Sequence, residues 1–121
     1  MSKKKILVVD DEINIRSLLK RMLGEDYLVI EAENGREAIN ISRAENPDLI
    51  LMDIMMPDVD GYTACSAVKT YPATSRIPVV MLTAVGFELN RALAARVGAD
   101  GYMTKPFSSD ELKQTIAPFL K

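Results

Sequence analysis

Five polar side chains that can bind metal or phosphate stand at the ends of apolar runs in this 121-residue sequence. Asp10 and Asp11 follow the first run, and Asp53 follows the third. Thr83 ends the fourth run, and Lys105 follows the fifth. If these runs are parallel strands, their carboxyl ends share one edge of a sheet, where ligands bind in such folds. We therefore expect the five side chains to converge there.

Three carboxylates, a hydroxyl and an ammonium group together suit phosphoryl transfer. Mg²⁺ prefers oxygen ligands, usually one or two carboxylates with water and a phosphate oxygen. Carboxylates that lie close together repel one another unless a cation binds. Lys105 offers a compact positive charge and Thr83 offers a hydroxyl donor. An Asp in such surroundings can act as a nucleophile and form an aspartyl phosphate, because phosphoryl transfer needs mainly positioning and charge stabilisation.

Each of these residues also has a purely structural interpretation. Asp10 and Asp11 could cap the first helix, because Asp is a favoured N-cap residue. Thr83 alone is a strand former, and Lys105 alone would be a surface cation or a salt-bridge partner. Capping does not explain four complementary groups at four strand ends, so the combination favours a functional site.

The elements that must position these residues follow from the hydrophobic periodicity. Apolar runs typical of buried parallel strands alternate with amphipathic helical segments. This alternation predicts right-handed strand–helix units in a parallel sheet. A chain of this length supports one domain, which we place over residues 1–121. The expected strands are 6–9, 27–32, 49–52, 79–82 and 101–103.

Five helices are expected to follow the five strands. Gly24 and Gly98 should end the first and fourth helices, and Pro118 should fray the end of the fifth. Asp58 and Asp60 are expected as loop or cap residues of the third helix. Capping boxes are expected at Asn34–Glu37 and Ser108–Glu111. The apolar faces should contain Ile15, Leu18, Leu19, Met22 and Leu23, then Ala38 and Ile41, then Ala64, Cys65 and Val68, then Leu89, Ala92, Leu93 and Val97, and last Leu112, Ile116, Phe119 and Leu120.

The composition excludes several classes of protein. The 15 basic and 17 acidic residues leave a formal charge of −2, which argues against direct nucleic-acid binding. The absence of His excludes His-based acid–base catalysis and His metal sites, and the single Cys excludes an internal disulfide. The sequence contains neither a long apolar span nor a signal-peptide core, so we expect a cytoplasmic protein without membrane contact.

The whole sequence resembles the receiver domains of two-component response regulators, of the chemotaxis-regulator type. Four segments carry the resemblance: 6–12 (ILVVDDE), 49–61 (LILMDIMMPDVDG), 81–84 (MLTA) and 101–107 (GYMTKPF). The family implies a flavodoxin-like α/β fold, in which a doubly wound five-stranded parallel sheet has the strand order 2-1-3-4-5. It also implies a signalling domain rather than a classical enzyme.

The resemblance assigns a role to each residue of the acidic site. Asp53 matches the phosphoacceptor of the family, and Lys105 matches its phosphate-binding Lys. Asp11 matches a direct ligand of Mg²⁺, with Mn²⁺ as an alternative ion, and Asp10 matches the partner of that ligand. Asp53 would also bind the metal, and Met55 would contribute its backbone carbonyl.

The resemblance also assigns a conformational switch. Thr83 matches the hydroxyl residue that moves toward the phosphoryl group, and Tyr102 matches the aromatic residue that follows it. Without the family match, Tyr102 would be interpreted as a half-buried strand aromatic. Ala84 matches a small residue beside the site, and Pro106 matches a proline that follows a cis peptide bond.

A sensor histidine kinase would therefore donate a phosphoryl group to Asp53. The face formed by the fourth helix, fifth strand and fifth helix would then change shape and act on an effector protein or on an output domain outside this sequence. The same face could support a phosphorylation-dependent dimer. Specificity for the kinase would lie on the first helix, around Ile15, Leu18 and Leu19.

We expect self-dephosphorylation to be slow. Met55 and Val85 occupy the positions at which the family tunes hydrolysis, and both side chains are apolar. Apolar side chains orient an attacking water poorly, and the chain has no His that could act as a general base.

Other interpretations of the same fold fit the residues less well. Phosphatases of the haloacid dehalogenase type carry Asp-x-Asp after the first strand, whereas Asp10 and Asp11 are adjacent and Glu12 follows. Neither glycine-rich nucleotide motif is present, and the two Asp residues would repel the phosphate of FMN. A phosphorylation-independent interaction module remains an alternative, although such receivers normally lack one or more of the site residues.

Overall fold

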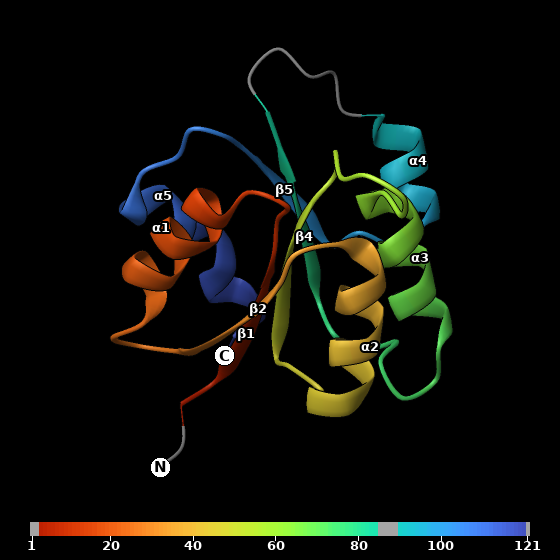
Figure 1. The fold of residues 1–121 in the computed structure, drawn as a ribbon, viewed down its shortest axis with the longest axis horizontal. Coiled ribbons are helices and arrows are strands. Elements are labelled where there is room, and N and C mark those ends of the chain that lie inside the picture. Colours follow the sequence, from red (N-terminus) through yellow and green to blue (C-terminus); the bar gives the residue numbers. More distant parts are fainter. Residues whose placement is uncertain (1–2, 85–89, 121) are drawn as a thin grey trace.

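The computed structural model describes residues 3–84 and 90–120. Five parallel strands form one sheet with the order β2-β1-β3-β4-β5, and helices lie on both of its faces (Figure 1). The predicted fold class and strand order are therefore confirmed. The strands are β1 (Lys5–Val9), β2 (Leu28–Ala32), β3 (Leu49–Asp53), β4 (Val79–Thr83) and β5 (Gly101–Thr104).

All five predicted strands are present, and their ends differ from the expectation by at most one residue. Asp53 and Thr83 are the last residues of their strands rather than the first residues of loops, because Asp53 still pairs with Leu82 and Thr83 with Thr104. Tyr27 lies outside β2, since its N–H donates to the carbonyl of Leu23 in the turn after the first helix.

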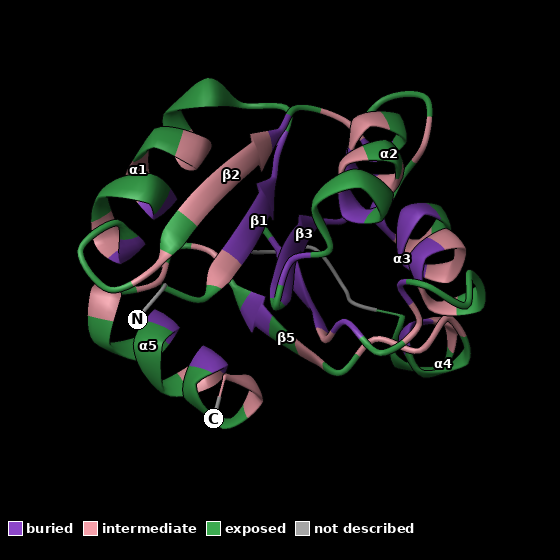
Figure 2. Cartoon of the chain, turned by 90° about the horizontal axis from the view of Figure 1, so that it is seen from below, coloured by how far each residue is buried: buried purple, intermediate pink, exposed green. Residues whose placement is uncertain are grey.

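Helices cover the two faces of the sheet in separate groups. One face packs against α1 (Ile13–Leu23) and α5 (Ser109–Ile116), and the other packs against α2 (Gly35–Glu45), α3 (Gly61–Thr70) and α4 (Arg91–Arg96) (Figures 1 and 2). Alternate strand residues supply two separate cores because successive side chains point to opposite faces. Among the described residues, no helix is long and apolar enough to cross a membrane.

Side-chain caps define where four of the helices begin in the described part of the chain, namely α2, α3, α4 and α5. The predicted box at Ser108 and Glu111 is complete at the start of α5. At α2, Asn34 accepts a hydrogen bond from the N–H of Glu37, but the carboxylate of Glu37 accepts from the N–H of Glu33. Only half of this predicted box is therefore present. Asp60 caps α3, as expected.

The two adjacent Asp residues after β1 do not cap α1. The N-cap residue is Glu12, and its side chain makes no capping hydrogen bond. Asp10 lies two residues earlier, where its Oδ1 accepts from the N–H of Glu12 at 2.9 Å. Capping therefore does not account for the Asp10–Asp11 pair, although Gly24 ends this helix as predicted.

The fourth helix is shorter than its apolar spacing predicts. It begins after the N-cap Asn90, and Gly98 follows it at a φ of 87°. Leu89 and Val85, which were expected to contribute to the helix and the site, lie outside the described residues. In this two-turn helix Ala94 is the buried residue, whereas Ala92 is exposed and was wrongly placed on the apolar face.

The last helix ends where Pro118 predicts. The α-helical part stops at Ile116, and a short 3-10 helix, η1 (Ala117–Phe119), contains the proline. Proline has no backbone N–H, and its ring clashes with the carbonyl of the preceding helical turn, so an α-helix does not continue through it.

Candidate functional site

The carboxyl ends of the strands bring the predicted site residues to one edge of the sheet, the upper edge in Figure 1. Asp53 ends β3 and Thr83 ends β4, while Asp10 follows β1 and Lys105 follows β5. Asp10 and Asp53 are buried, unlike most acidic residues, and Thr83 is buried as well. These four residues are 95 positions apart at the extremes, and the parallel sheet places them together.

The ammonium group of Lys105 bridges two carboxylates at the centre of this edge. Its Nζ donates to Oδ2 of Asp10 at 2.7 Å and to Oδ1 of Asp53 at 3.3 Å. The backbone N–H of Lys105 donates to the carbonyl of Thr83, which continues the pairing of β4 with β5. The peptide bond between Lys105 and Pro106 is cis.

Burial and charge oppose one another at Asp53. Burial, followed by the negative charge of Asp10, raises the pKa of Asp53 to about 6, and Lys105 limits the rise. Burial lowers the pKa of Lys105, but its hydrogen bond to Asp10 and the charge of Asp53 outweigh burial, so that its pKa is raised overall. Lys105 therefore carries a positive charge at neutral pH, while Asp53 titrates at a pH just below neutral.

Asp10 uses both of its carboxylate oxygens within the protein. Oδ2 accepts from Lys105 and Oδ1 accepts from the N–H of Glu12. Carboxylate oxygens of Asp10, Asp11 and Glu12 lie within 4.8 Å of one another. This cluster combines one buried carboxylate with two exposed ones. Oxygen donors of this kind fit Mg²⁺.

The acidic cluster differs in membership from the predicted metal ligands. Glu12 was not singled out as a ligand, although its place directly after two Asp residues was a visible signal. Asp53 is linked to Asp10 through the Lys105 ammonium group, which contacts both carboxylates. The side chain of Met55 is exposed.

The backbone after β3 is held closely by Gly61, the first residue of α3. A Cβ atom at this position would collide with the carbonyl oxygen of Asp53 and would lie 2.7 Å from Cα of Ile54. The N–H of Gly61 donates to the carbonyl of Ile54 at 2.9 Å. The absence of a side chain at Gly61 therefore lets α3 begin directly against Asp53.

The hydroxyl of Thr83 is only weakly held. Its Oγ1 donates to Oγ1 of Thr104 on β5 at 3.4 Å, which is long for a hydrogen bond between hydroxyl groups. Thr104 was not singled out from the sequence, because its role depends on the register between β4 and β5.

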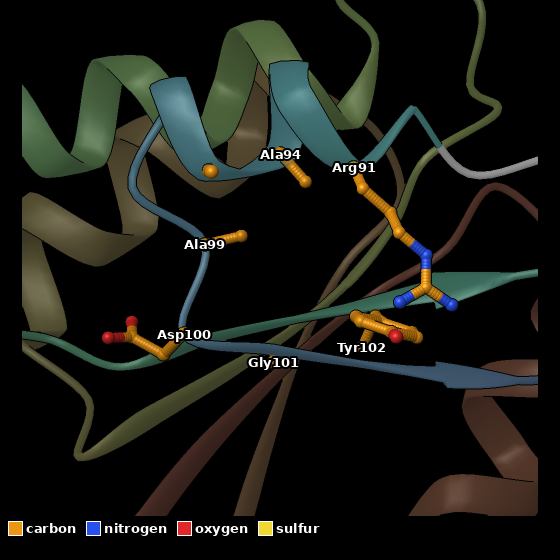
Figure 3. A pocket seen from close by; sticks show the side chains of 7 residues that line it. Arg91, Ala94, Ala99, Asp100, Gly101 and Tyr102 are labelled. Carbon is orange, nitrogen blue, oxygen red and sulfur yellow. The ribbon is translucent and has the colours of Figure 1, made fainter.

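Tyr102 lies beside α4 on the outer edge of the sheet. Tyr102 is 44% exposed on β5, so its position in this structure also fits the interpretation as a half-buried strand aromatic. The guanidinium group of Arg91 lies over the ring, 5.0 Å from the centroid. Both residues line a pocket that also contains Ala94 and Ala99 (Figure 3).

The first helix divides the three residues expected to contact a kinase. Leu19 is fully buried in the core against the sheet and cannot contact a partner. Ile15 and Leu18 are partly exposed and line a groove with Pro106 and Phe107. The helical periodicity included Leu19 because it cannot separate a core face from an adjoining surface.

Comparison with known proteins gives consistent matches. The sequence profile of the response regulator receiver domain matches residues 6–117. The transcriptional regulatory protein ResD of Bacillus subtilis is 47% identical over 118 residues, which cover 97% of this chain and 48% of ResD. The chemotaxis protein CheY of Halobacterium salinarum is 41% identical over 118 residues, which cover 97% of each chain. The chain spans about half the length of the transcriptional regulators that it matches.

Solved structures give the same result. The receiver domain of the sensor histidine kinase PA1611 from Pseudomonas aeruginosa has a magnesium ion coordinated in its active site cleft. It is 28% identical to this chain, with a TM-score of 0.89 and coverage of 98% of each chain. These matches confirm the resemblance of the sequence to receiver domains.

Proposed function

This chain belongs to the response regulator receiver domain family of two-component signalling, and we propose that its Asp53 accepts a phosphoryl group from a sensor histidine kinase. The observation that carries the proposal is the Lys105 ammonium group, which contacts both Asp10 and Asp53 at the carboxyl edge of the sheet. A cation in this position can bind the phosphoryl oxygens during transfer.

The transfer replaces a phosphorus–nitrogen bond by a phosphorus–oxygen bond. A carboxylate oxygen of Asp53 attacks phosphorus, and the electron pair of the broken bond goes to the imidazole nitrogen of the kinase. The pKa of Asp53, about 6, leaves its carboxylate largely ionised at neutral pH, as a nucleophile requires. Lys105 faces the growing negative charge on the phosphoryl oxygens.

A divalent ion completes the site in this proposal. Asp10, Asp11, Asp53 and the backbone carbonyl of Met55 would hold Mg²⁺, which would neutralise charge between the carboxylates and the phosphoryl oxygens. The receiver domain of PA1611 supports this assignment because it holds magnesium in its active site cleft. The exposed carboxylate of Glu12 belongs to the same cluster, and Mn²⁺ is an alternative ion.

Phosphorylation would act on the face of α4, β5 and α5. Thr83 would move toward the phosphoryl group, and Tyr102 would then leave its exposed position beside Arg91. A ligand shifts such an equilibrium only as far as it binds one state better than the other. The partner would be a downstream effector or an output domain, and residues 1–121 would form the receiver domain. The same face could support a phosphorylation-dependent dimer.

Intact-mass spectrometry tests the phosphoryl-acceptor proposal. The chain is incubated with acetyl phosphate and Mg²⁺, beside Asp53→Ala and the matched control Asp58→Ala in the neighbouring loop. We expect one phosphoryl adduct on the wild type and on Asp58→Ala, and none on Asp53→Ala or in the presence of EDTA. A folded wild-type protein that binds Mg²⁺ but forms no adduct would favour a phosphorylation-independent interaction module.

Loss of the phosphoryl group is proposed to be slow. The exposed side chain of Met55 beside the site is apolar and offers an attacking water no hydrogen bond. The phosphorylated protein, freed of acetyl phosphate, would be followed by intact mass over time. Decay within seconds would contradict this prediction.

A further inference from the structure

Arg16 on α1 is a largely buried cation that the proposed phosphoryl transfer does not use. Its Nη1 donates to the backbone carbonyl of Asp10 at 2.6 Å, and its Nε donates to Oε1 of Glu31 at 3.2 Å. The side chain of Arg16 is 11% exposed. One guanidinium group therefore connects α1 to the end of β1 and to β2. Lysine, with a single ammonium group, does not reproduce this planar two-armed arrangement.

The carbonyl that Arg16 contacts belongs to the peptide unit between Asp10 and Asp11. Because a peptide unit is planar, holding this carbonyl also fixes the direction of the N–H of Asp11. On the other side, the N–H of Asp10 donates to the carbonyl of Ala32. Arg16 can therefore set the directions in which both carboxylates leave the backbone, without contacting either carboxylate.

Glu31 holds the guanidinium group in this position. It lies on the edge strand β2, where it pairs in register with Val8 of β1. Its other carboxylate oxygen lies 3.9 Å from Nζ of Lys20. The connection from Glu31 through Arg16 to Asp10 thus runs from the outermost strand, β2, to the acidic cluster.

We propose that Arg16 is a positioning residue for the acidic cluster: through the carbonyl of Asp10 it holds Asp10 and Asp11 in the orientation that binds a divalent cation, and Glu31 orients Arg16. The inference deepens the proposed function and rests on it, because it concerns the same metal ligands. Groups that orient metal ligands in this way commonly change metal affinity by a factor of about 10 to 100 when they are removed.

A purely electrostatic role would have the opposite effect. A fixed positive charge beside three carboxylates weakens cation binding, so its removal would strengthen binding. Positioning predicts weaker binding instead, and it predicts this also for Arg16→Lys, which retains the charge. The sign of the change therefore separates the two roles.

The test measures Mg²⁺ affinity directly, with magnesium chloride as the only probe. Amide proton–nitrogen NMR spectra of the full chain are recorded during titration of the wild type, Arg16→Lys, Arg16→Met and Glu31→Gln. We expect both Arg16 variants to bind Mg²⁺ roughly tenfold more weakly. Glu31→Gln should show a smaller loss, because its amide oxygen can still accept from Nε. The same spectra report whether each variant is folded. If Arg16→Met does not fold, Arg16→Lys and Glu31→Gln are enough to test the positioning role.

Lys69 and Asp100 provide a matched control away from the acidic cluster. Their ion pair is 2.7 Å long, with side chains 14% and 35% exposed, compared with 11% and 34% for Arg16 and Glu31. Lys69→Met should lower the melting temperature but leave Mg²⁺ affinity unchanged. If the Arg16 variants also lose only stability, or if they bind Mg²⁺ more tightly, the positioning role is overturned. If the wild type itself does not bind Mg²⁺, the metal-dependent function fails as well.

Discussion

At the scale of single residues, Asp53 is a carboxylate whose ionisation the folded chain disfavours. Its pKa rises from 3.8 to about 6 because of burial and the nearby charge of Asp10. At pH values between these two, Asp53 is mostly protonated in the folded protein but mostly ionised in the unfolded chain. The free energy of unfolding therefore falls as pH rises from about 4 to 6, and the loss persists at neutral pH.

Asp53→Asn should for this reason stabilise the protein at neutral pH. The amide has nearly the same shape and no charge, and Lys105 keeps its contact with Asp10. Urea unfolding in EDTA should show a gain of about 3 kcal/mol at pH 7 that is largely lost near pH 4. The control is Asp58→Asn, whose carboxylate is exposed and pairs with Arg36. A gain of equal size at both pH values would show that the ionisation of Asp53 is not its source.

The residues that the sequence identified and those that it missed differ in a physical way. Asp10, Asp53, Thr83 and Lys105 could be predicted to converge because each one follows or ends an apolar strand, and parallel strands end at one edge. The other contributors depend on tertiary neighbours that have no local signature. Arg16, for example, has the same local pattern as a solvated helix cation until β2 brings Glu31 beside it.

At the scale of elements, the turn between β3 and α3 places Asp53 through close backbone packing. Gly61 begins α3 with no room for a side chain, because the backbone of Asp53 and Ile54 occupies the space a Cβ would need. Backbone atoms cannot move aside as the end of a flexible side chain can. The position of α3 is therefore coupled to the position of the phosphoacceptor candidate.

Gly61→Ala should lower the free energy of unfolding by about 1–3 kcal/mol, the usual effect of inserting a methyl group where there is no space. It should also slow phosphorylation by acetyl phosphate, because Asp53 must shift. The matched control is Gly101→Ala on β5, where an added Cβ would make only ordinary contacts at 3.7 Å. Urea unfolding and intact-mass time courses check both effects, and equal behaviour of the two variants would contradict the packing argument.

The elements themselves were predictable to different degrees. The strands were easy to locate because β3 and β4 are buried on both faces and are continuously apolar except for their last residues. The fourth helix was not, because its alanine-rich sequence is compatible with several choices of buried face. Only the packing of Ala94 against the rest of the fold selects one of them.

At the scale of the whole molecule, the two cores and the carboxyl edge of the sheet have separate roles. Each face of the sheet has its own core of buried residues beneath its own helices (Figure 2). The carboxyl edge instead gathers Asp10, Asp11, Glu12 and Asp53, with Lys105 between Asp10 and Asp53. Folding therefore concentrates negative charge at one edge, and a bound cation would relieve the resulting repulsion.

Mg²⁺ should for this reason stabilise the whole molecule against heat. An ion that binds only the folded chain adds about 2.7 kcal/mol at a concentration 100 times its dissociation constant, which for a chain of this size raises the melting temperature by several degrees. Asp11→Ala should abolish this rise. Because Asp11 is exposed, its loss should leave the melting temperature in EDTA almost unchanged. Asp26→Ala, which removes an exposed carboxylate that pairs with Lys113, should retain the full rise. A wild-type melting curve unaffected by millimolar Mg²⁺ would mean that the carboxylates at this edge do not form a metal site.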